Sequence, residues 1–210
     1  DLEAPRVPVT KREASARLKI VVLGRLSPQK GTELLRAAAV DLGPQAEIVL
    51  LGCGKDGVKL GEALGWRAIE RYEPADLPTL LATEAPHAGL LVSVIPETFS
   101  YTLSELQSLG IPPLATMLGS FEERIINGET GFLFAPEARA LVELVEKLRA
   151  DPTLLEKVAQ ALADLPHHRD VAQMVADYRA VLPVSPRPVA RFAVGIGEET
   201  ALTEPYRHLL

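Results

Sequence analysis

The stretch Leu18-Lys-Ile-Val-Val-Leu23, which Gly24 ends, is a short apolar run rich in β-branched residues. A run of this kind is typical of a β-strand that is buried on both faces of a sheet. Short runs of similar character, bounded by glycine, proline or polar residues, recur along the chain. We expect further strands at residues 46–51, 66–69, 88–94, 112–115 and 131–134.

Helical patterns separate these runs. The pattern after the first run puts four apolar residues on one face, namely Leu34, Leu35, Ala38 and Ala39. We expect further helices at about residues 55–64, 76–82, 101–109, 121–126, 137–150, 152–162 and 171–182. Because strands alternating with helices form βαβ units, the predicted fold class is α/β, a doubly wound parallel sheet of about six strands with helices on both faces.

The predicted sheet tells us where to look for a site. Ligands bind such sheets at the carboxyl ends of the strands, near the point where the strand order reverses. The loops that follow Leu23, Leu51 and Val94 leave those ends. We therefore expect the functional residues to lie in these three loops.

Composition narrows the classes of protein. The net charge of −6 argues against a nucleic-acid binder, which is normally basic. No apolar run approaches the roughly 18 to 20 residues that a membrane span needs. The single Cys53 has no partner for an intrachain disulfide, so a reducing compartment is expected. Together these features predict a cytoplasmic protein.

The chain divides into three parts by composition. Residues 1–17 are polar and contain proline, so we interpret them as a linker or N-terminal extension, with sequence missing upstream of Asp1. Residues 18–182 form the predicted α/β domain. Three prolines occur between Pro183 and Pro188, and residues 183–210 are interpreted as a linker and C-terminal tail.

The strongest functional signal is Pro96-Glu-Thr-Phe-Ser-Tyr-Thr-Leu-Ser-Glu105, at the junction of a loop and a helix. Glu97 lies in the loop, and Glu105 lies about one turn inside the helix. Between them, a helix N-terminus leaves unpaired backbone N–H groups that attract an anion. We expect these to be the N–H groups of Phe99, Ser100 and Tyr101. A diphosphate there would have a carboxylate on each side to accept sugar hydroxyls.

This segment resembles the C-terminal, donor-binding domain of the large retaining glycosyltransferases of the two-domain Rossmann-like type, GT-B, in family 4 of the glycosyl transferases group 1. Those domains carry a Glu, seven residues and a second Glu, with a Phe two positions after the first, as Glu97, Phe99 and Glu105 do here. Further similar segments follow in the family's order: Gly24-Arg25, Lys30-Gly31, 109–112, Glu122-Glu123 and 127–133. The resemblance covers roughly Lys19 to Ala163.

The resemblance implies roles for individual residues. Glu97 would contact the transferred sugar, and Glu105 the nucleotide ribose. Arg25 and Lys30 would neutralise the diphosphate leaving group, where charge builds as the glycosidic bond breaks. Glu97, Arg25 and Lys30 are therefore the candidate catalytic residues. The implied donor-binding set is Gly24, Arg25, Lys30, Glu97, Thr98, Phe99, Ser100, Tyr101 and Glu105. Neither a metal nor a cofactor is expected beside the nucleotide-sugar donor.

The sequence departs from the family's pattern in two places. Thr98 and Ser100 stand where the family often has glycine, although both are small. The family's Gly-rich segment before the following helix is Met117-Leu-Gly-Ser-Phe121 here, with one glycine. How the sugar is contacted from that side is therefore open.

Other motifs have plainer interpretations. Gly52-Cys53-Gly54 lacks the third glycine of a dinucleotide fingerprint and is interpreted as a tight turn. Cys53 has no neighbouring His to activate it as a nucleophile. His167-His-Arg-Asp170 is better interpreted as a polar helix cap than as a metal site. Tyr72 is expected either near the nucleotide base or in a packing role.

We predict the donor-binding domain of a retaining glycosyltransferase that transfers a sugar from a nucleotide-diphosphate sugar to a glycan or lipid-linked acceptor. Such an enzyme would act in polysaccharide or lipopolysaccharide synthesis, in the cytoplasm or peripherally on the cytoplasmic membrane face. A missing N-terminal domain would bind the acceptor, so this chain alone would transfer little sugar. A nucleotide-sugar epimerase and a non-catalytic nucleotide-sugar-binding module on the same fold remain the alternatives.

Overall fold

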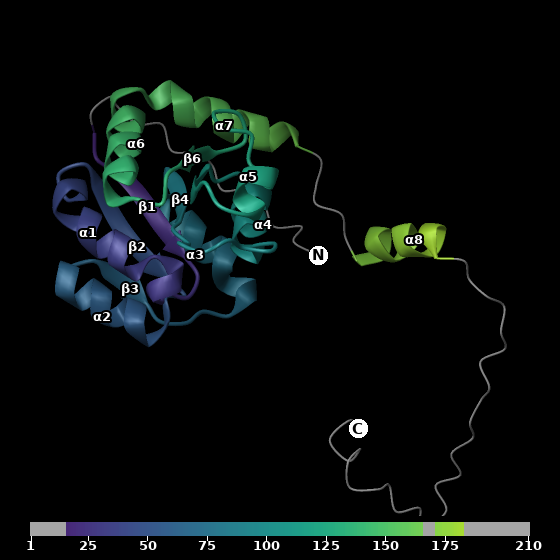
Figure 1. Cartoon of the computed structure of the whole chain (residues 1–210), viewed down its shortest axis with the longest axis horizontal. Coiled ribbons are helices and arrows are strands. Elements are labelled where there is room, and N and C mark those ends of the chain that lie inside the picture. Colours follow the sequence, from purple (N-terminus) through teal and green to yellow (C-terminus); the bar gives the residue numbers. More distant parts are fainter. Residues whose placement is uncertain (1–15, 166–170, 183–210) are drawn as a thin grey trace, which may run out of the picture. The chain divides into compact units, whose positions relative to one another are not determined.

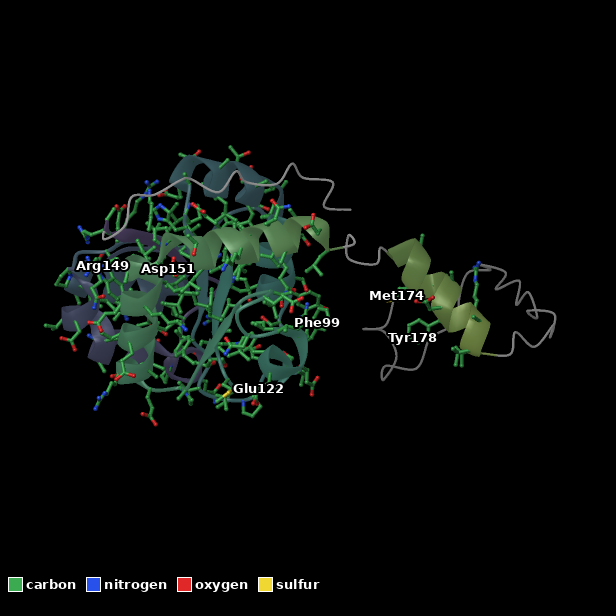
Figure 2. The ribbon with its side chains drawn as sticks, turned by 90° about the horizontal axis from the view of Figure 1, so that it is seen from above. Phe99, Glu122, Arg149, Asp151, Met174 and Tyr178 are labelled. Atoms are coloured by element: carbon green, nitrogen blue, oxygen red, sulfur yellow. The ribbon has the colours of Figure 1, made fainter. Side chains whose placement is uncertain are left out.

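The computed structural model describes residues 16–165 and 171–182 of the 210-residue chain (Figure 1). The chain forms two compact units, residues 1–168 and 169–210. Helix α8 (Val171–Val181) lies in the second unit. The predicted domain bounds of 18–182 stay a prediction. Within the second unit, Met174 and Tyr178 lie four residues apart on one face of α8 and are exposed (Figure 2). The expected cap at 167–170 and the two terminal segments fall outside the described residues.

The six predicted strands are present in one all-parallel sheet, in the order β3-β2-β1-β4-β5-β6. Their bounds are β1 Leu18–Leu23, β2 Ala46–Leu51, β3 Arg67–Ile69, β4 Ala88–Leu91, β5 Pro113–Thr116 and β6 Phe132–Phe134. Strand β4 ends at Leu91 and not at residue 94 as predicted. The chain leaves the sheet there because the Val94 N–H donates to the Gln29 carbonyl oxygen, at 2.9 Å, in the loop after β1.

Helices cover both faces of the sheet, as the alternating pattern predicted (Figure 1). In the first unit they are α1 Thr32–Leu42, α2 Gly54–Leu64, α3 Leu77–Glu84, α4 Tyr101–Ser108, α5 Ser120–Arg124, α6 Ala138–Ala150 and α7 Pro152–Asp164, with short 3-10 turns η1 Pro28–Lys30 and η2 Pro74–Asp76. Helices α1, α2, α6 and α7 pack on one face, and α3, α4 and α5 on the other. None of the described helices has both the length and the apolarity that crossing a bilayer requires.

Strand β1 shows why the apolar run is continuous. Ile20 and Val22 belong to the core beneath α1 and α6, whereas Val21 and Leu23 belong to the core on the opposite face. All four side chains are buried. Burying each apolar side chain contributes roughly 1.5–3 kcal/mol, so strands lacking a polar face are stabilised only between two helical layers.

The strand order reverses between β1 and β4. Strand β1 pairs with β2 on one side and with β4 on the other, in the register Ile20↔Ala88. Loops leaving neighbouring strands at such a switch point run to opposite faces and leave a crevice at the carboxyl edge. The loops after β1 and β4 border this crevice, so the fold places two of the three predicted loops around one site.

Candidate functional site

The loop after β1 positions Lys30. The Ser27 side chain accepts a hydrogen bond from the Lys30 N–H at 3.2 Å, which caps the short turn η1. Gly31 follows with a φ of +82°, and a Cβ there would lie 2.0 Å from the Val92 carbonyl oxygen. Only glycine allows this close approach, so the turn packs against the chain that leaves β4. Lys30 is thereby held over the crevice.

The loop after β4 positions Glu97, and the segment before α5 fixes it. The Ser120 N–H donates to the Glu97 carbonyl oxygen at 2.9 Å. Gly119 has a φ of +56°, and a Cβ there would lie 2.7 Å from the same oxygen. The one glycine kept in the 117–121 segment is thus the residue that lets this segment touch the Glu97 backbone.

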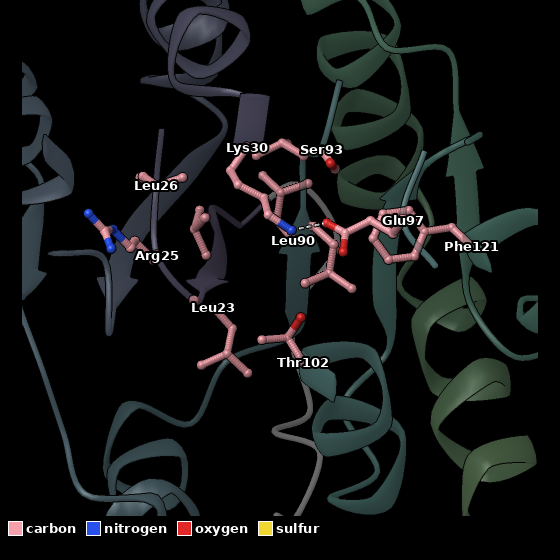
Figure 3. A pocket seen from close by; sticks show the side chains of 13 residues that line it. Leu23, Arg25, Leu26, Lys30, Leu90, Ser93, Glu97, Thr102 and Phe121 are labelled. Atoms are coloured by element: carbon pink, nitrogen blue, oxygen red, sulfur yellow. Dashed lines mark hydrogen bonds and ion pairs between the residues drawn. The ribbon is translucent and has the colours of Figure 1, made fainter. Parts of the chain in front are cut away.

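Lys30 Nζ and Glu97 Oε1 form an ion pair inside a pocket of about 140 Å³ (Figure 3). The Glu97 side chain is 16% exposed and that of Lys30 is 46% exposed. Residues from both sides of the switch point line the pocket: Val22, Leu23, Gly24, Arg25, Leu26, Lys30, Leu90, Leu91, Val92, Ser93, Glu97, Thr102 and Phe121. The structure therefore brings together one predicted cation and one predicted carboxylate.

Arg25 lies in the same pocket lining but not in the ion pair. Its stem lies close to Gly54, where a Cβ would be 3.2 Å from Arg25 Cγ. Figure 3 shows its guanidinium directed away from Lys30 and Glu97. The side chain is exposed, and among the described residues it has no ion-pair partner. Lys30 therefore contacts Glu97 in the pocket, whereas Arg25 is a nearby charge without an ion-pair partner among the described residues.

The loop leads into α4 as predicted. Ser100 is the N-cap residue, and its hydroxyl oxygen accepts from the Leu103 N–H at 3.3 Å. It has a φ of +65°, the left-handed region that favours glycine, which accounts for the family's preference at this position. Within the described part of the chain, the N–H groups of Phe99, Ser100 and Tyr101 donate to no acceptor. These are the three N–H groups that the sequence predicted to bind an anion, and that role stays a prediction. Thr98, Phe99 and Tyr101 have exposed side chains.

Arg124, at the end of α5, contacts this loop and was not anticipated. Its guanidinium donates to the Phe99 and Ser100 carbonyl oxygens, the latter at 3.1 Å, and to the Ser104 hydroxyl at 2.7 Å. It also lies 4.3 Å from the centre of the Phe99 ring, whose other neighbour is the Tyr101 ring at 5.3 Å. Burial lowers the pKa of Arg124. An arginine among glutamates and isoleucines gives no sequence signal for binding carbonyl groups.

Glu105 lies apart from the pocket and close to Tyr72. Burial raises the pKa of Glu105, and its carboxylate has no hydrogen-bond partner among the described residues. Burial, together with the Glu105 charge, raises the pKa of Tyr72 to about 12. The Tyr72 ring lies on Gly52, where a Cβ would be 2.6 Å from Tyr72 Cε1. The loops after β2 and β3 therefore meet α4 at a second corner of the same sheet edge.

The environment of Cys53 does not favour a catalytic role. Cys53 is buried, its thiol donates to the Ile69 carbonyl oxygen at 3.4 Å, and burial raises its pKa. An inert thiol fits this position better than a nucleophile. Across residues 16–165 and 171–182, no three His, Cys, Asp or Glu side chains gather closely enough to hold a metal ion.

Fold and site together define a class of protein: a doubly wound α/β domain whose switch point carries a cation, a carboxylate and N–H groups that have no acceptor among the described residues. The chain belongs to the family of glycosyl transferases group 1, which its residues 8–163 match. HepE from Anabaena, solved with UDP and glucose, is similar at 26% identity and a TM-score of 0.66, over 79% of this chain and 49% of HepE.

Two further solved structures share the fold. Sucrose-phosphate synthase from Thermosynechococcus elongatus matches at 23% identity and a TM-score of 0.62, over 80% of this chain and 46% of that one. The C-terminal domain of the glycosyl transferase group 1 protein LpcC from Francisella tularensis matches at 24% and 0.57, over 70% of this chain and 83% of that domain. The chain thus spans about half the length of the HepE and sucrose-phosphate synthase chains.

Proposed function

We propose that this chain is the donor-binding part of a retaining family 4 glycosyltransferase, which binds a nucleotide-diphosphate sugar at the switch point between β1 and β4. One observation carries the proposal: the N–H groups at the start of α4, which have no acceptor among the described residues, lie in the same loop as Glu97, which pairs with Lys30. Backbone N–H groups at a helix N-terminus and a lysine are complementary to a diphosphate. The HepE structures, solved with UDP and with UDP-glucose, support a uridine diphosphate sugar as the first donor to test.

The residues of the pocket have distinct roles in this proposal. Lys30 binds the diphosphate, and Glu97, released from Lys30, accepts hydroxyl groups of the sugar. Arg25 is exposed, so its guanidinium can turn toward the phosphates. Glu105 accepts the ribose hydroxyls at the other corner, where its carboxylate has no hydrogen-bond partner among the described groups.

These groups act on the leaving group. When the bond between the anomeric carbon and the phosphate oxygen breaks, its electron pair stays on the diphosphate. Positive groups already in place around those oxygens stabilise the transition state. No metal is needed in this scheme. Retention of configuration follows from the family resemblance. A separate domain binds the glycan or lipid-linked acceptor, so this chain alone transfers little sugar, and the enzyme acts on the cytoplasmic side in polysaccharide or lipopolysaccharide synthesis.

Isothermal titration calorimetry tests the proposal with UDP, UDP-glucose and uridine, with and without EDTA. We expect UDP to bind more tightly than uridine, and EDTA to leave the affinity unchanged. Glu105→Ala should weaken the binding of all three ligands, whereas Glu62→Ala, at an exposed position on α2, should not. Screening of GDP, ADP and dTDP in the same way identifies the base. Failure of every diphosphate to bind would contradict the proposal.

A further inference from the structure

Arg124 binds main-chain atoms in place of an acidic partner. Within the described residues it forms no ion pair with a carboxylate, although Glu122 and Glu123 are its close neighbours in sequence. Its guanidinium instead donates to the carbonyl oxygens of Phe99 and Ser100. A partly desolvated arginine whose Nη1 donates to two consecutive carbonyl oxygens, while its Nη2 donates to the Ser104 hydroxyl, fixes the orientation of the peptide units to which those carbonyls belong.

Holding these two carbonyl groups also sets the direction of the N–H groups in the same peptide units. Peptide bonds here are trans, so the C=O of one residue and the N–H of the next point in opposite directions. When Arg124 holds the Phe99 oxygen, the Ser100 N–H must point away from Arg124. The Ser100 oxygen, which accepts from Arg124 and also from the Ser104 N–H at 3.4 Å, fixes the Tyr101 N–H in the same way. These two N–H groups have no acceptor among the described residues.

We propose that Arg124 is a positioning residue, which turns the N–H groups of Ser100 and Tyr101 outward as a prepared site for the donor diphosphate. The proposal rests on the proposed function of the loop. Two further contacts keep the guanidinium in place: the Ser104 hydroxyl at 2.7 Å, and the Phe99 ring, which the guanidinium faces at 4.3 Å. The bonds to the carbonyls also help hold Ser100 at its φ of +65°.

The orientation can be tested on the ligand-free chain. In ¹⁵N-labelled protein we expect Arg124→Met to move or broaden the amide signals of Ser100 and Tyr101. The matched control is Arg139→Met, because Arg139 is exposed and pairs with Glu143 on the same helix. Ser104→Ala, which removes one bond of the guanidinium and none from the carbonyls, should have a smaller effect in the same direction. Unchanged Ser100 and Tyr101 signals in Arg124→Met would overturn the proposal. If that variant does not fold, Arg124→Lys takes its place, and signals identical to those of the unchanged chain would overturn it in the same way.

Ligand affinity then separates positioning from a general loss of structure. Arg124→Met should weaken UDP binding by about tenfold, yet leave uridine binding within about twofold, because only UDP carries phosphates. Arg124→Lys keeps the charge but loses the Nη2 bond to Ser104 and the planar contact with the Phe99 ring, so it should recover only part of the UDP affinity. Full recovery by Lys, or equal losses for UDP and uridine, would overturn the positioning role. If the unchanged chain does not bind UDP, the uridine donor is wrong, and the amide signals alone still test the orientation.

Discussion

Lys30 and Glu97 form an ion pair across the switch point of the sheet, although 67 positions separate them in the sequence. Each comes from a loop that follows one of two neighbouring strands. Gly31 lets the first loop pack against Val92, and Gly119 lets the segment before α5 pack against the Glu97 backbone. The pair places a cation and a carboxylate where the proposed donor has a diphosphate and a sugar.

Replacing Lys30 tests the phosphate role. Lys30→Met should weaken UDP binding by roughly 10- to 100-fold, since a hydrogen bond to a charged group contributes about 1.5–3 kcal/mol. Uridine binding should change little. Lys59→Met, at an exposed position on α2, is the matched control and should leave both affinities unchanged. Calorimetry at two salt concentrations measures both affinities. If Lys30→Met weakened uridine binding as much as UDP binding, Lys30 would only maintain the structure of the loop.

Gly119 should tolerate no side chain because it touches the Glu97 backbone. Gly119→Ala puts a Cβ 2.7 Å from the Glu97 oxygen, whereas Gly128 has a similar positive φ of +82° and nothing within 4 Å of a Cβ. Both alanines carry backbone strain of order 1 kcal/mol, but only one carries the clash. Urea unfolding should therefore show Gly119→Ala to be the less stable variant, with weaker binding of UDP-glucose. Equal stability of the two would show that the loop moves aside without cost.

Ser100 combines a helix cap with a strained backbone. Ser100→Ala loses the bond from the Leu103 N–H and keeps the φ of +65°, so it should destabilise the chain by about 1 kcal/mol. Ser100→Gly loses the same bond but relieves the strain, so its free energy of unfolding should lie close to that of the unchanged chain. Chemical denaturation of the three proteins gives the comparison, and a glycine variant less stable than the alanine variant would contradict it.

Glu105 gives a pH dependence with a definite sign. Burial raises the pKa of Glu105 in the folded chain above the ordinary 4.5. Between 4.5 and the pKa of the folded chain, the folded chain therefore holds a proton that the unfolded chain has released. Stability from this group therefore falls as pH rises through that window. Glu105→Gln should raise the melting temperature at about pH 7, and this effect should shrink as the pH falls below 4.5, where the carboxyl becomes neutral in both states. Glu62→Gln is the exposed control.

The same substitution affects Tyr72. Its pKa of about 12 is raised first by burial and second by the Glu105 charge. In Glu105→Gln the pKa should fall but stay above 10, because burial remains. An NMR titration, with Tyr72→Phe to assign the signal, measures it. A pKa that does not change would place the Glu105 carboxylate farther from Tyr72 than the structure has it.

The fold could be predicted from the sequence because each strand and helix is marked by a pattern within a few neighbouring residues. Each strand is a short apolar run, and alternating helices dictate a parallel sheet, as β1 and the strands after it confirm. Strand β4 was predicted too long because residues 92–94 are apolar enough for a strand, while the bonds that take them out of the sheet come from Gln29, far away in sequence.

The candidate site could be predicted only in part. The Glu97 loop and the start of α4 lie within one continuous segment, so their spacing was visible in the sequence. The Arg124 contacts were not, because they join α5 to carbonyl groups, and every residue has a carbonyl group. Arg25 and Lys30 looked equivalent in sequence. The stem of Arg25 lies near Gly54 on the far side of its loop, and this separates the two.

The strand order also sets when the pocket can exist. A newly made chain that has reached only α3 holds β1, β2 and β3 but not Glu97 or α4. Because contacts between residues far apart in sequence form more slowly than local helices, we expect the crevice to be assembled late in folding. A nucleotide that binds there can therefore stabilise only the fully joined sheet. Such a ligand would raise the stability of the complete domain but not that of the part that contains only β1, β2 and β3.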